Sequence, residues 1–241
     1  PGRKNNGFSR PGNLAVKRYK IGSGEVSNFL LLEKVARTGK PIILSSGMSS
    51  FTELDAAVAF LKDFGNEVSV LQCTTSYPTP AERIGFNVLT EMRERYPNCR
   101  VGLSEHTGKV ATGIAARALG AELLEFHVVF DRRMFGPDAS SSLTIDEVRE
   151  LVNAVRFLER SFATPIDKND LHPYTELKRV FGKTLTVSRD LPIGHQLTFD
   201  DLEAAKPAGQ GIAADTFRSV IGRTLNKAKT QYDFLQAEDL D

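Results

Sequence analysis

The chain has few cysteines, no long apolar run and almost no net charge. Its 241 residues include only two cysteines, Cys73 and Cys99. Two cysteines in a chain of this size do not form a disulfide framework, so we expect a reducing, cytoplasmic location. No apolar run approaches the roughly 20 residues that a membrane span needs, and runs such as Val128 to Phe130 are strand-sized. We therefore expect neither a disulfide scaffold nor a membrane protein.

The charge balance argues against a polyanionic partner. Lys and Arg number 31 against 30 Asp and Glu, which gives a net charge of +1, and we expect neither nucleic acid nor an anionic membrane as the main partner. With 41% hydrophobic and 25% charged residues the composition is that of a globular chain. The chain opens on Pro1 rather than Met, and residues 1–20 contain no acid. We expect a processed or truncated chain in which residues 1–17 form a flexible tail.

Short apolar runs alternate with amphipathic stretches through residues 18–162. The expected strands cover residues 18–22, 41–45, 68–74, 100–104 and 121–127, and the expected helices cover 26–38, 51–64, 87–96, 110–119 and 144–162. This alternation predicts an α/β domain of parallel strands joined by crossover helices. It fits an open doubly wound sheet or a (β/α)8 barrel. About five strand–helix units are visible, so a barrel would lack its first three.

The alternation of expected strands and helices ends after residue 162. Residues 163–177 contain two prolines and no sustained period, which predicts a linker. Residues 178–241 combine a short alternating run with turns and a capped helical turn. We expect a second, small β-rich domain there, near the lower size limit for independent folding. No internal repeat is evident.

Polar residues follow the first two expected strands. Lys20 and Ser23 end the first strand in a glycine-rich turn, where an ammonium and a hydroxyl suit an anion, and Glu25 can accept from hydroxyls. Ser45 ends the second strand just before Gly47 and the next helix, which suits phosphate oxygens. Each motif by itself is equally typical of an ordinary turn or helix cap.

Two further loops carry polar side chains in an irregular setting. Thr75 and Tyr77 lie in a loop made rigid by two prolines. Asp138 belongs to a Gly-Pro-Asp turn after the last strand, where a carboxylate can bind a polyol or an ammonium group. A packed tyrosine and an ordinary turn explain these residues equally well.

Ser104, His106 and His127 end the last two expected strands. The histidines are too far apart in sequence to share one helix or turn, but adjacent parallel strands place their ends at the same rim. Two imidazoles there can hold a divalent cation whose remaining ligands are water and substrate. Since no cysteine or third histidine stands nearby, the predicted site is open and catalytic rather than structural zinc. The remaining histidines are expected at the surface.

Taken in order, these motifs resemble the N-acetylneuraminate (sialic acid) synthase family. The matching segments are residues 19–25, 41–48, 72–80, 101–107 and 125–138, and residues 182–202 with 220–222 resemble that family's antifreeze-like (SAF) domain. The resemblance implies a (β/α)8 TIM-type barrel whose first third is missing, residues 18–162 here. The SAF domain would be residues 178–241, and the molecule a domain-swapped homodimer.

The resemblance also implies a reaction and residue roles. Family members condense phosphoenolpyruvate with N-acetylmannosamine or a related sugar, releasing phosphate and a nine-carbon 2-keto acid. Manganese or magnesium would sit on His106 and His127. The remaining matched positions are Lys20, Ser23, Ser45 and Ser104 for the phosphate and carboxylate of phosphoenolpyruvate, and Glu25, Tyr77 and Asp138 for the catalytic sugar side.

The chain departs from the family pattern at a few positions. Thr75 replaces a common Asn or Ser, Ala139 stands where a His often occurs, and Lys206 replaces an Arg that reaches the partner subunit's sugar. A lysine ammonium cannot reproduce the bidentate hydrogen bonds that an arginine guanidinium makes. Two alternatives remain open: a synthase for legionaminic, pseudaminic or spore-coat sugar acids, and a non-catalytic sugar-binding remnant of a truncated barrel.

Overall fold

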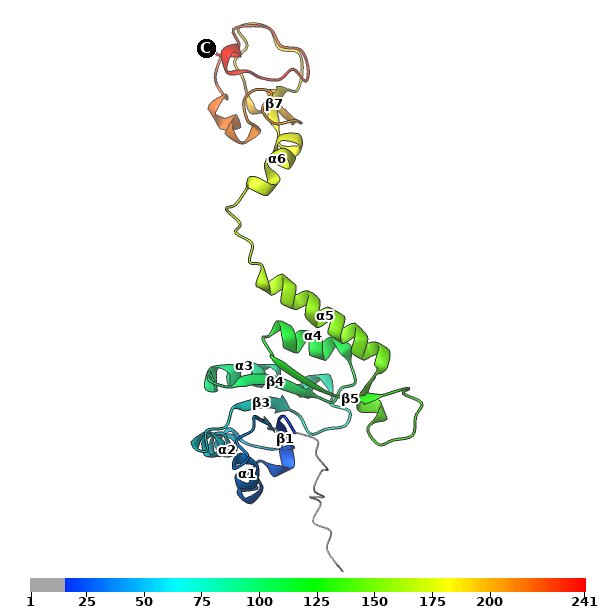
Figure 1. Ribbon diagram of the computed structural model, residues 1–241. Helices are drawn as coiled ribbons and strands as arrows, with labels where there is room; N and C mark the ends of the chain where they lie inside the picture. The colour runs from blue at the N-terminus through cyan, green and yellow to red at the C-terminus, as the bar shows by residue number, and fades with distance from the viewer. Residues whose placement is uncertain (1–15) are drawn as a thin grey trace, which may run out of the picture. The chain divides into compact units, whose positions relative to one another are not determined.

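The computed structural model describes residues 16–241, shown in Figure 1. All but the last two residues of the predicted tail, 1–17, lie outside the described part. The chain divides into two compact units, one ending at Pro165 and the other spanning Ile166–Asp241. No helix within residues 16–241 combines the length and apolar character that crossing a membrane requires.

The first unit contains one parallel sheet whose strands follow one another in chain order (Figure 1). The strands are β1 (Tyr19–Ile21), β2 (Ile42–Ser45), β3 (Val68–Cys73), β4 (Arg100–Glu105), β5 (Leu123–Val129) and β6 (Ser142–Thr144). Each hydrogen-bonds its neighbour in parallel register. The helices between them are α1 (Phe29–Ala36), α2 (Phe51–Asp63), α3 (Phe86–Arg95), α4 (Val110–Ala118) and α5 (Ile145–Ala163). The predicted alternation of parallel strands and helices is therefore confirmed.

Alternation along the strands separates an apolar face from a polar face. The outer face carries Ile42, Leu44, Val70 and Leu103, which are buried in one core together with residues of α1, α2 and α3. The positions between them form the inner face. Its polar members toward the strands' carboxyl ends are Lys20, Ser45, Cys73, Ser104 and Glu125. The helices cover the outer face, and the inner face carries the polar side chains.

The sheet curls, as an ion pair across it demonstrates. Lys20 Nζ on β1 lies 3.0 Å from Glu125 Oε1 on β5, although three strands lie between β1 and β5. At about 4.8 Å per strand a flat sheet would separate these strands by roughly 19 Å, farther than the two side chains reach. The inner face is therefore concave. Of the two predicted architectures, the partial TIM-type barrel is the one that the structure has.

Helix ends follow their local sequence signals. Ser50 with Glu53 and Thr144 with Glu147 form capping boxes at the starts of α2 and α5, as the spacing of the second pair predicts. The first helix begins at Phe29 rather than residue 26, because Asn28 caps it by accepting from the Leu31 amide. Strand β6 was not expected: three residues are too short for a period, and pairing with β5 defines it.

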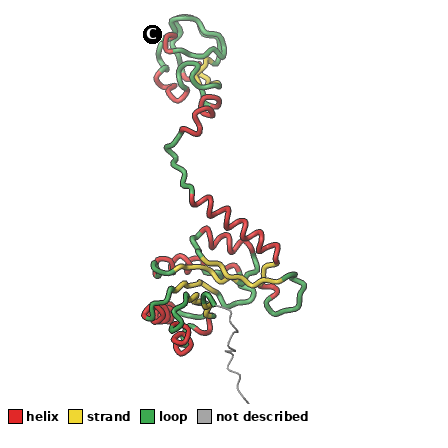
Figure 2. Tube along the Cα trace, viewed as in Figure 1, coloured by secondary structure: helices red, strands yellow, loops and turns green. Residues whose placement is uncertain are grey.

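The second unit consists mostly of loops, as Figure 2 shows. Its strands β7 (Thr184–Val187) and β8 (Leu202–Ala205) pair antiparallel, and helix α6 (Thr175–Phe181) precedes them. The core comprises Leu185, Val187, Leu191, Leu197, Val220, Leu225, Leu235 and Leu240. Helix α6 occupies residues where a linker and then an extended run were expected. Residues 175–181 include good helix formers and are followed by Gly182, which favours a helix that ends there. The alternating pattern in this stretch is too short to distinguish the period of a strand from that of a helix.

The second unit contains two halves with equivalent backbone hydrogen bonds, a repeat that was not recognised from the sequence. The amide of Gly194 donates to Leu225 O at 2.7 Å, and the amide of Tyr232, 38 residues later, donates to Val187 O at 2.8 Å. Leu191 and Lys229, related by the same offset, exchange both of their backbone hydrogen bonds at 2.8 and 2.9 Å. Few residues are identical between the halves, so the repeat is one of backbone pairing rather than composition. The expectation of no internal repeat was wrong.

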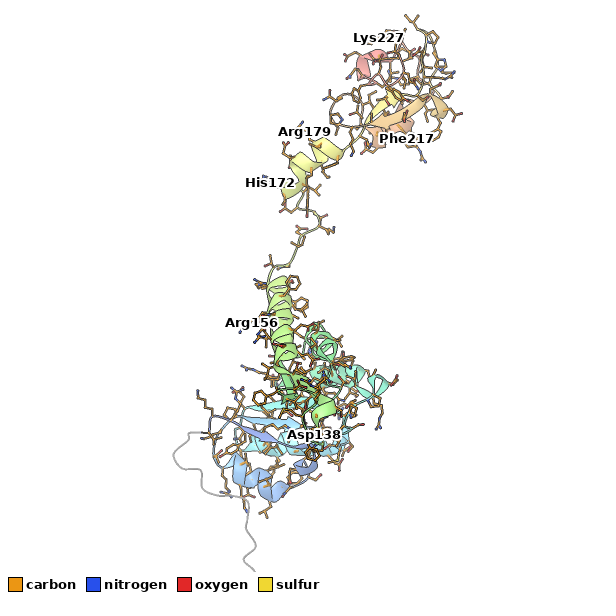
Figure 3. The ribbon with its side chains drawn as sticks, turned by 90° about the vertical axis from the view of Figure 1, so that its right-hand side faces the viewer. Asp138, Arg156, His172, Arg179, Phe217 and Lys227 are labelled. Carbon is orange, nitrogen blue, oxygen red and sulfur yellow. The ribbon has the colours of Figure 1, made fainter. Side chains whose placement is uncertain are left out.

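Each half contains one fully buried aspartate. Asp201 accepts from the Thr198 amide and hydroxyl and lies 2.8 Å from His195 Nε2 and 2.7 Å from the Arg189 guanidinium. Its counterpart Asp239 pairs with two lysines, one of them Lys227, which Figure 3 labels. These buried, charge-assisted networks stabilise a unit with little regular secondary structure.

Candidate functional site

An ionic network crosses the concave inner face. Lys20 Nζ lies 3.0 Å from Glu125 Oε1, and the same oxygen accepts from the Ser104 hydroxyl at 2.8 Å. Ser104 is buried and lies directly opposite Glu125 in the register of β4 and β5. The network holds the Lys20 ammonium at a fixed position inside the curl, where an ammonium has hydrogens besides the one that faces Glu125, whereas Ser104 donates its single hydrogen to Glu125. That arrangement suits a carboxylate or phosphate ligand.

Glu125 is the site residue that the sequence analysis missed. It stands two positions before His127 on β5, so strand alternation places both on the inner face. That spacing is the signal from which a role for Glu125 could have been predicted. The structure shows that Glu125 is the group that positions both Lys20 and Ser104.

A cluster of hydroxyls and a thiol surrounds Gly47, just after β2. The Gly47 amide donates to Ser23 Oγ at 2.9 Å, and Ser23 Oγ lies 3.3 Å from Ser45 Oγ and 3.6 Å from Cys73 Sγ. A Cβ placed on Gly47 would lie 2.7 Å from Ser23 Oγ and 2.8 Å from Cys73 Sγ, and closer still to Thr75 Oγ1. Glycine is therefore needed for this close approach. The cluster brings together three residues that the sequence predicted separately, Ser23, Ser45 and Thr75.

The two histidines meet at the rim of the sheet. The ring centroids of His106 and His127 lie 5.1 Å apart with the planes nearly perpendicular, and the Tyr77 ring lies 4.3 Å from that of His106. His127 Nδ1 lies 3.3 Å from Asp138 Oδ2. Asp138 belongs to the loop that follows β5 and is labelled in Figure 3. The expectation that neighbouring strands bring the two rings together is confirmed.

The environment of His106 favours a neutral ring with one free nitrogen. His106 is 4% exposed, and burial lowers the pKa of its imidazole. Its Nδ1 lies 2.9 Å from the Thr74 carbonyl oxygen, which only accepts, so Nδ1 carries the proton and donates. The lone pair is then on Nε2. A neutral imidazole with its other nitrogen held by a carbonyl is the form that binds metal ions.

The donor set fits a divalent cation in an open site. Two adjacent imidazoles can bind Mn²⁺ or Mg²⁺, and a carbonyl fixes the Nδ1 of one of them. Oxygens of substrate and water would complete the coordination. Within residues 16–241 no group of three or more His, Cys, Asp or Glu side chains is arranged to hold a metal. The chain's own contribution is therefore the His106–His127 pair, and a metal on it remains a prediction.

Two predicted site residues lie outside these clusters. Glu25 is exposed and accepts from Asn28 Nδ2 at 2.6 Å, next to the start of α1. Lys206 belongs to the second unit, where its Nζ lies 4.5 Å from the centroid of the Phe181 ring. The remaining predicted residues belong to the three clusters described above.

Comparison with known proteins gives a consistent picture. Residues 12–167 match the NeuB family. The chain is 32% identical over 228 residues to human N-acetylneuraminate-9-phosphate synthase, covering 95% of this chain and 63% of that protein. It is 30% identical over 217 residues to N,N'-diacetyllegionaminic acid synthase of Campylobacter jejuni, covering 89% and 64%. The chain thus spans less than two thirds of the length of these relatives.

A solved structure agrees with the sequence comparisons. N-acetylneuraminic acid synthetase of Leptospira borgpetersenii, crystallised with citrate, superposes with a TM-score of 0.62 at 26% identity. The superposition covers 68% of this chain and 58% of that one.

Proposed function

The chain belongs to the NeuB family, and from that premise we propose that it carries the major part of a sugar-acid synthase. The proposed reaction condenses phosphoenolpyruvate with N-acetylmannosamine or a related amino sugar, giving a nine-carbon 2-keto acid and phosphate. The observation that carries the proposal is the convergence of three clusters on one concave face: the Lys20–Glu125–Ser104 network, the hydroxyls around Gly47, and the paired histidines. Human and bacterial sugar-acid synthases among the relatives support it.

The anionic substrate suits the inner face. Phosphoenolpyruvate carries a phosphate and a carboxylate, and the proposed donors to them are the Lys20 ammonium and the hydroxyls of Ser23, Ser45 and Ser104. Ser23 and Ser104 would turn their hydroxyls from Ser45 and Glu125 to the substrate. Glu125 keeps the Lys20 ammonium inside the curl instead of leaving it to extend into solvent. Donors fixed before the substrate arrives hold the reacting carbon without reorganisation during the reaction.

The acceptor sugar would approach from the rim. In the proposed reaction carbon 3 of phosphoenolpyruvate forms a bond to the aldehyde carbon of the open-chain sugar. Water then adds at carbon 2, and the bond from carbon 2 to the phosphate oxygen breaks, releasing phosphate. Tyr77 and Asp138 lie beside the two histidines, where they can hold and orient sugar hydroxyls. Glu25 and Thr75 are proposed to complete the sugar side.

A divalent cation on His106 and His127 would act as a Lewis acid toward the acceptor's carbonyl oxygen. The chain's own part is to hold both rings close together with a nitrogen directed to the ion. The Thr74 carbonyl fixes the tautomer of His106 by accepting from its Nδ1, and Asp138 lies within reach of His127 Nδ1. Manganese or magnesium is the proposed ion.

For the second unit we propose the antifreeze-like (SAF) role. In a domain-swapped homodimer, Lys206 would reach the sugar bound by the partner subunit. Its cation now lies over the Phe181 ring, so sugar contact would replace this cation–π contact. Residues 178–241 would form that domain and residues 163–177 its linker.

The test is phosphate release from phosphoenolpyruvate and N-acetylmannosamine with Mn²⁺, measured on the full chain alone and with the amino-terminal barrel segment of a relative supplied. Product formation supports the proposal, and comparing N-acetylmannosamine with the precursors of legionaminic, pseudaminic and spore-coat acids identifies the acceptor. His106→Ala and His127→Ala should abolish turnover, whereas His172→Ala, far from the strand ends in sequence, should not. Sugar binding by calorimetry without product under any condition would favour a non-catalytic binding protein.

A further inference from the structure

A small cavity lies behind the histidine rim, on the outer side of the sheet. It has a volume of about 10 Å³, near the minimum that holds one water molecule. The loop after β3 lines it through Thr74 and Thr79. The other polar residues of the lining belong to the end of β4, the loop that follows it and the first turn of α4: Ser104, Glu105, His106, Thr107 and Thr112.

One acceptor on the cavity wall is unpaired. Glu105 is 3% exposed, and its Oε1 accepts from the Thr107 amide. Its Oε2 is buried and has no hydrogen-bond partner among the residues that the structure describes. A buried carboxylate oxygen without a donor is strongly disfavoured, so a donor is expected to meet it.

One donor on the same wall is also unpaired. The hydroxyls of Thr107 and Thr112 lie 2.9 Å apart, so one donates to the other. Two hydroxyls have two hydrogens, and their mutual bond uses only one of them. The Lys109 amide also donates to Thr107 Oγ1, so this oxygen already has a donor. The Thr107 side chain is also close enough to the Glu105 carboxylate to lower the pKa of Glu105, against the rise that burial causes. With Thr107 as the donor to Thr112, the remaining hydrogen is that of Thr112, which is buried and needs an acceptor.

We propose that one ordered water occupies this cavity, donating to Glu105 Oε2 and accepting from the free hydroxyl of the Thr107–Thr112 pair, and that Glu105 is thereby a positioning residue for His106. A water molecule supplies the donor and the acceptor that the wall lacks, and the cavity has room for one. The bridge ties the end of β4 to the first turn of α4.

The link to His106 runs through the loop that closes the cavity. The Thr74 carbonyl accepts from His106 Nδ1 at 2.9 Å, and the Thr79 amide donates to the His106 carbonyl at 3.0 Å. Thr74 and Thr79 also line the cavity, so its contents support this loop from behind. Strand alternation places Glu105 on the outer face, between Ser104 and His106, which face inward. Glu105 therefore acts through His106 and not on a ligand directly.

The first test is crystallographic and does not depend on the proposed reaction. Full-length wild type should show a water within hydrogen-bond distance of Glu105 Oε2 and of a threonine hydroxyl. Thr112→Val should lose it, because the isosteric side chain has no hydroxyl. A direct Glu105–Thr112 hydrogen bond with no water, or an unchanged water in Thr112→Val, would overturn the assignment.

The second test measures positioning, and its metal readout rests on the proposed function. Glu105→Leu should lose the His106–Thr74 hydrogen bond in the crystal and bind Mn²⁺ at least tenfold more weakly by calorimetry. Glu105→Gln keeps the Oε1 acceptor and offers a donor to the water, so it should stay within threefold of wild type. Glu122→Gln, exposed at the opposite end of the sheet, is the matched control.

The outcomes separate the two hypotheses. If Glu105→Leu retains the His106–Thr74 bond and the Mn²⁺ affinity of Glu122→Gln, the positioning role is wrong. If wild type binds no Mn²⁺, the metal part of the proposed function fails, and the His106–Thr74 bond in the crystals alone decides the positioning role. If Glu105→Leu does not fold, Thr112→Val replaces it in both readouts, with a threefold or greater loss of Mn²⁺ affinity expected.

Discussion

Gly47→Ala gives the sharpest test of the hydroxyl cluster, because one added carbon meets three side chains. The new Cβ would lie 2.7 Å from Ser23 Oγ and 2.8 Å from Cys73 Sγ, and nearer still to Thr75 Oγ1. All three distances are well below ordinary van der Waals contact. The φ of Gly47 lies outside the left-handed region, so the effect is steric and not conformational.

The expected magnitude follows from overpacking. Forcing one carbon into a packed cluster typically costs about 1–3 kcal/mol. For a unit of this size each kcal/mol lowers the melting temperature by about 2–4 °C, so we expect a fall of about 2–12 °C. Because the clash displaces Ser23 and Thr75 from their positions, the affinity for phosphoenolpyruvate should fall about tenfold or more, which corresponds to about 1.4 kcal/mol.

The assay compares Gly47→Ala with Gly22→Ala by urea denaturation and by calorimetry with phosphoenolpyruvate. Gly22 is the matched control because it stands in the preceding strand-end turn, has a φ of −70°, and has nothing within 4 Å of an added Cβ. Adding Thr75→Ala to Gly47→Ala should restore about 0.5–1 kcal/mol, since it removes the nearest of the three contacts.

Equal denaturation midpoints for the two glycine variants would refute the steric argument. A stability loss in Gly47→Ala without any change in phosphoenolpyruvate affinity would instead leave the packing argument intact and remove the cluster from the proposed anion site.

Two further predictions concern the second unit. Asp201→Asn should lower its stability by about 2–4 kcal/mol in urea denaturation followed by circular dichroism, because buried donors lose a charged acceptor; an unchanged midpoint would contradict this. Burial raises the pKa of Asp201, but the hydrogen bonds from His195 and Thr198 outweigh it and hold the pKa well below its usual value, so wild type should lose stability as pH falls below about 4, and Asp201→Asn should lose less. Gly194→Ala should cost about 1 kcal/mol because φ is +83°, whereas Tyr232→Gly should change stability by less, since relief at φ +71° is offset by a more flexible unfolded chain; equal losses would argue against this.

Much of the first unit could be predicted from its sequence because periodicity reports burial directly. Strands such as Val68–Cys73 and capped helices such as Ile145–Ala163 carry their own signals. The meeting of His106 and His127 followed from strand adjacency alone. Such inferences need only the order of elements, which parallel α/β topology restricts strongly.

The remainder depended on contacts that no local pattern encodes. The curl of the sheet is demonstrated by the Lys20–Glu125 pair, which joins residues more than a hundred positions apart. The need for glycine at position 47 arises from side chains on two other segments. The three-residue strand Ser142–Thr144 exists only because β5 pairs with it. Each is a property of packing.

The paired halves of the second unit determine how that unit folds as well as how it is built. Leu191 bonds Lys229, and Gly194 bonds Leu225, so the defining backbone pairs join residues more than thirty positions apart within a small unit. A nascent chain gains almost no core until both halves have emerged, because each half completes the other's sheet edges. High contact order of this kind slows folding. The unit should therefore refold in milliseconds to seconds, roughly the range of small all-β domains, rather than in the microseconds of helical bundles.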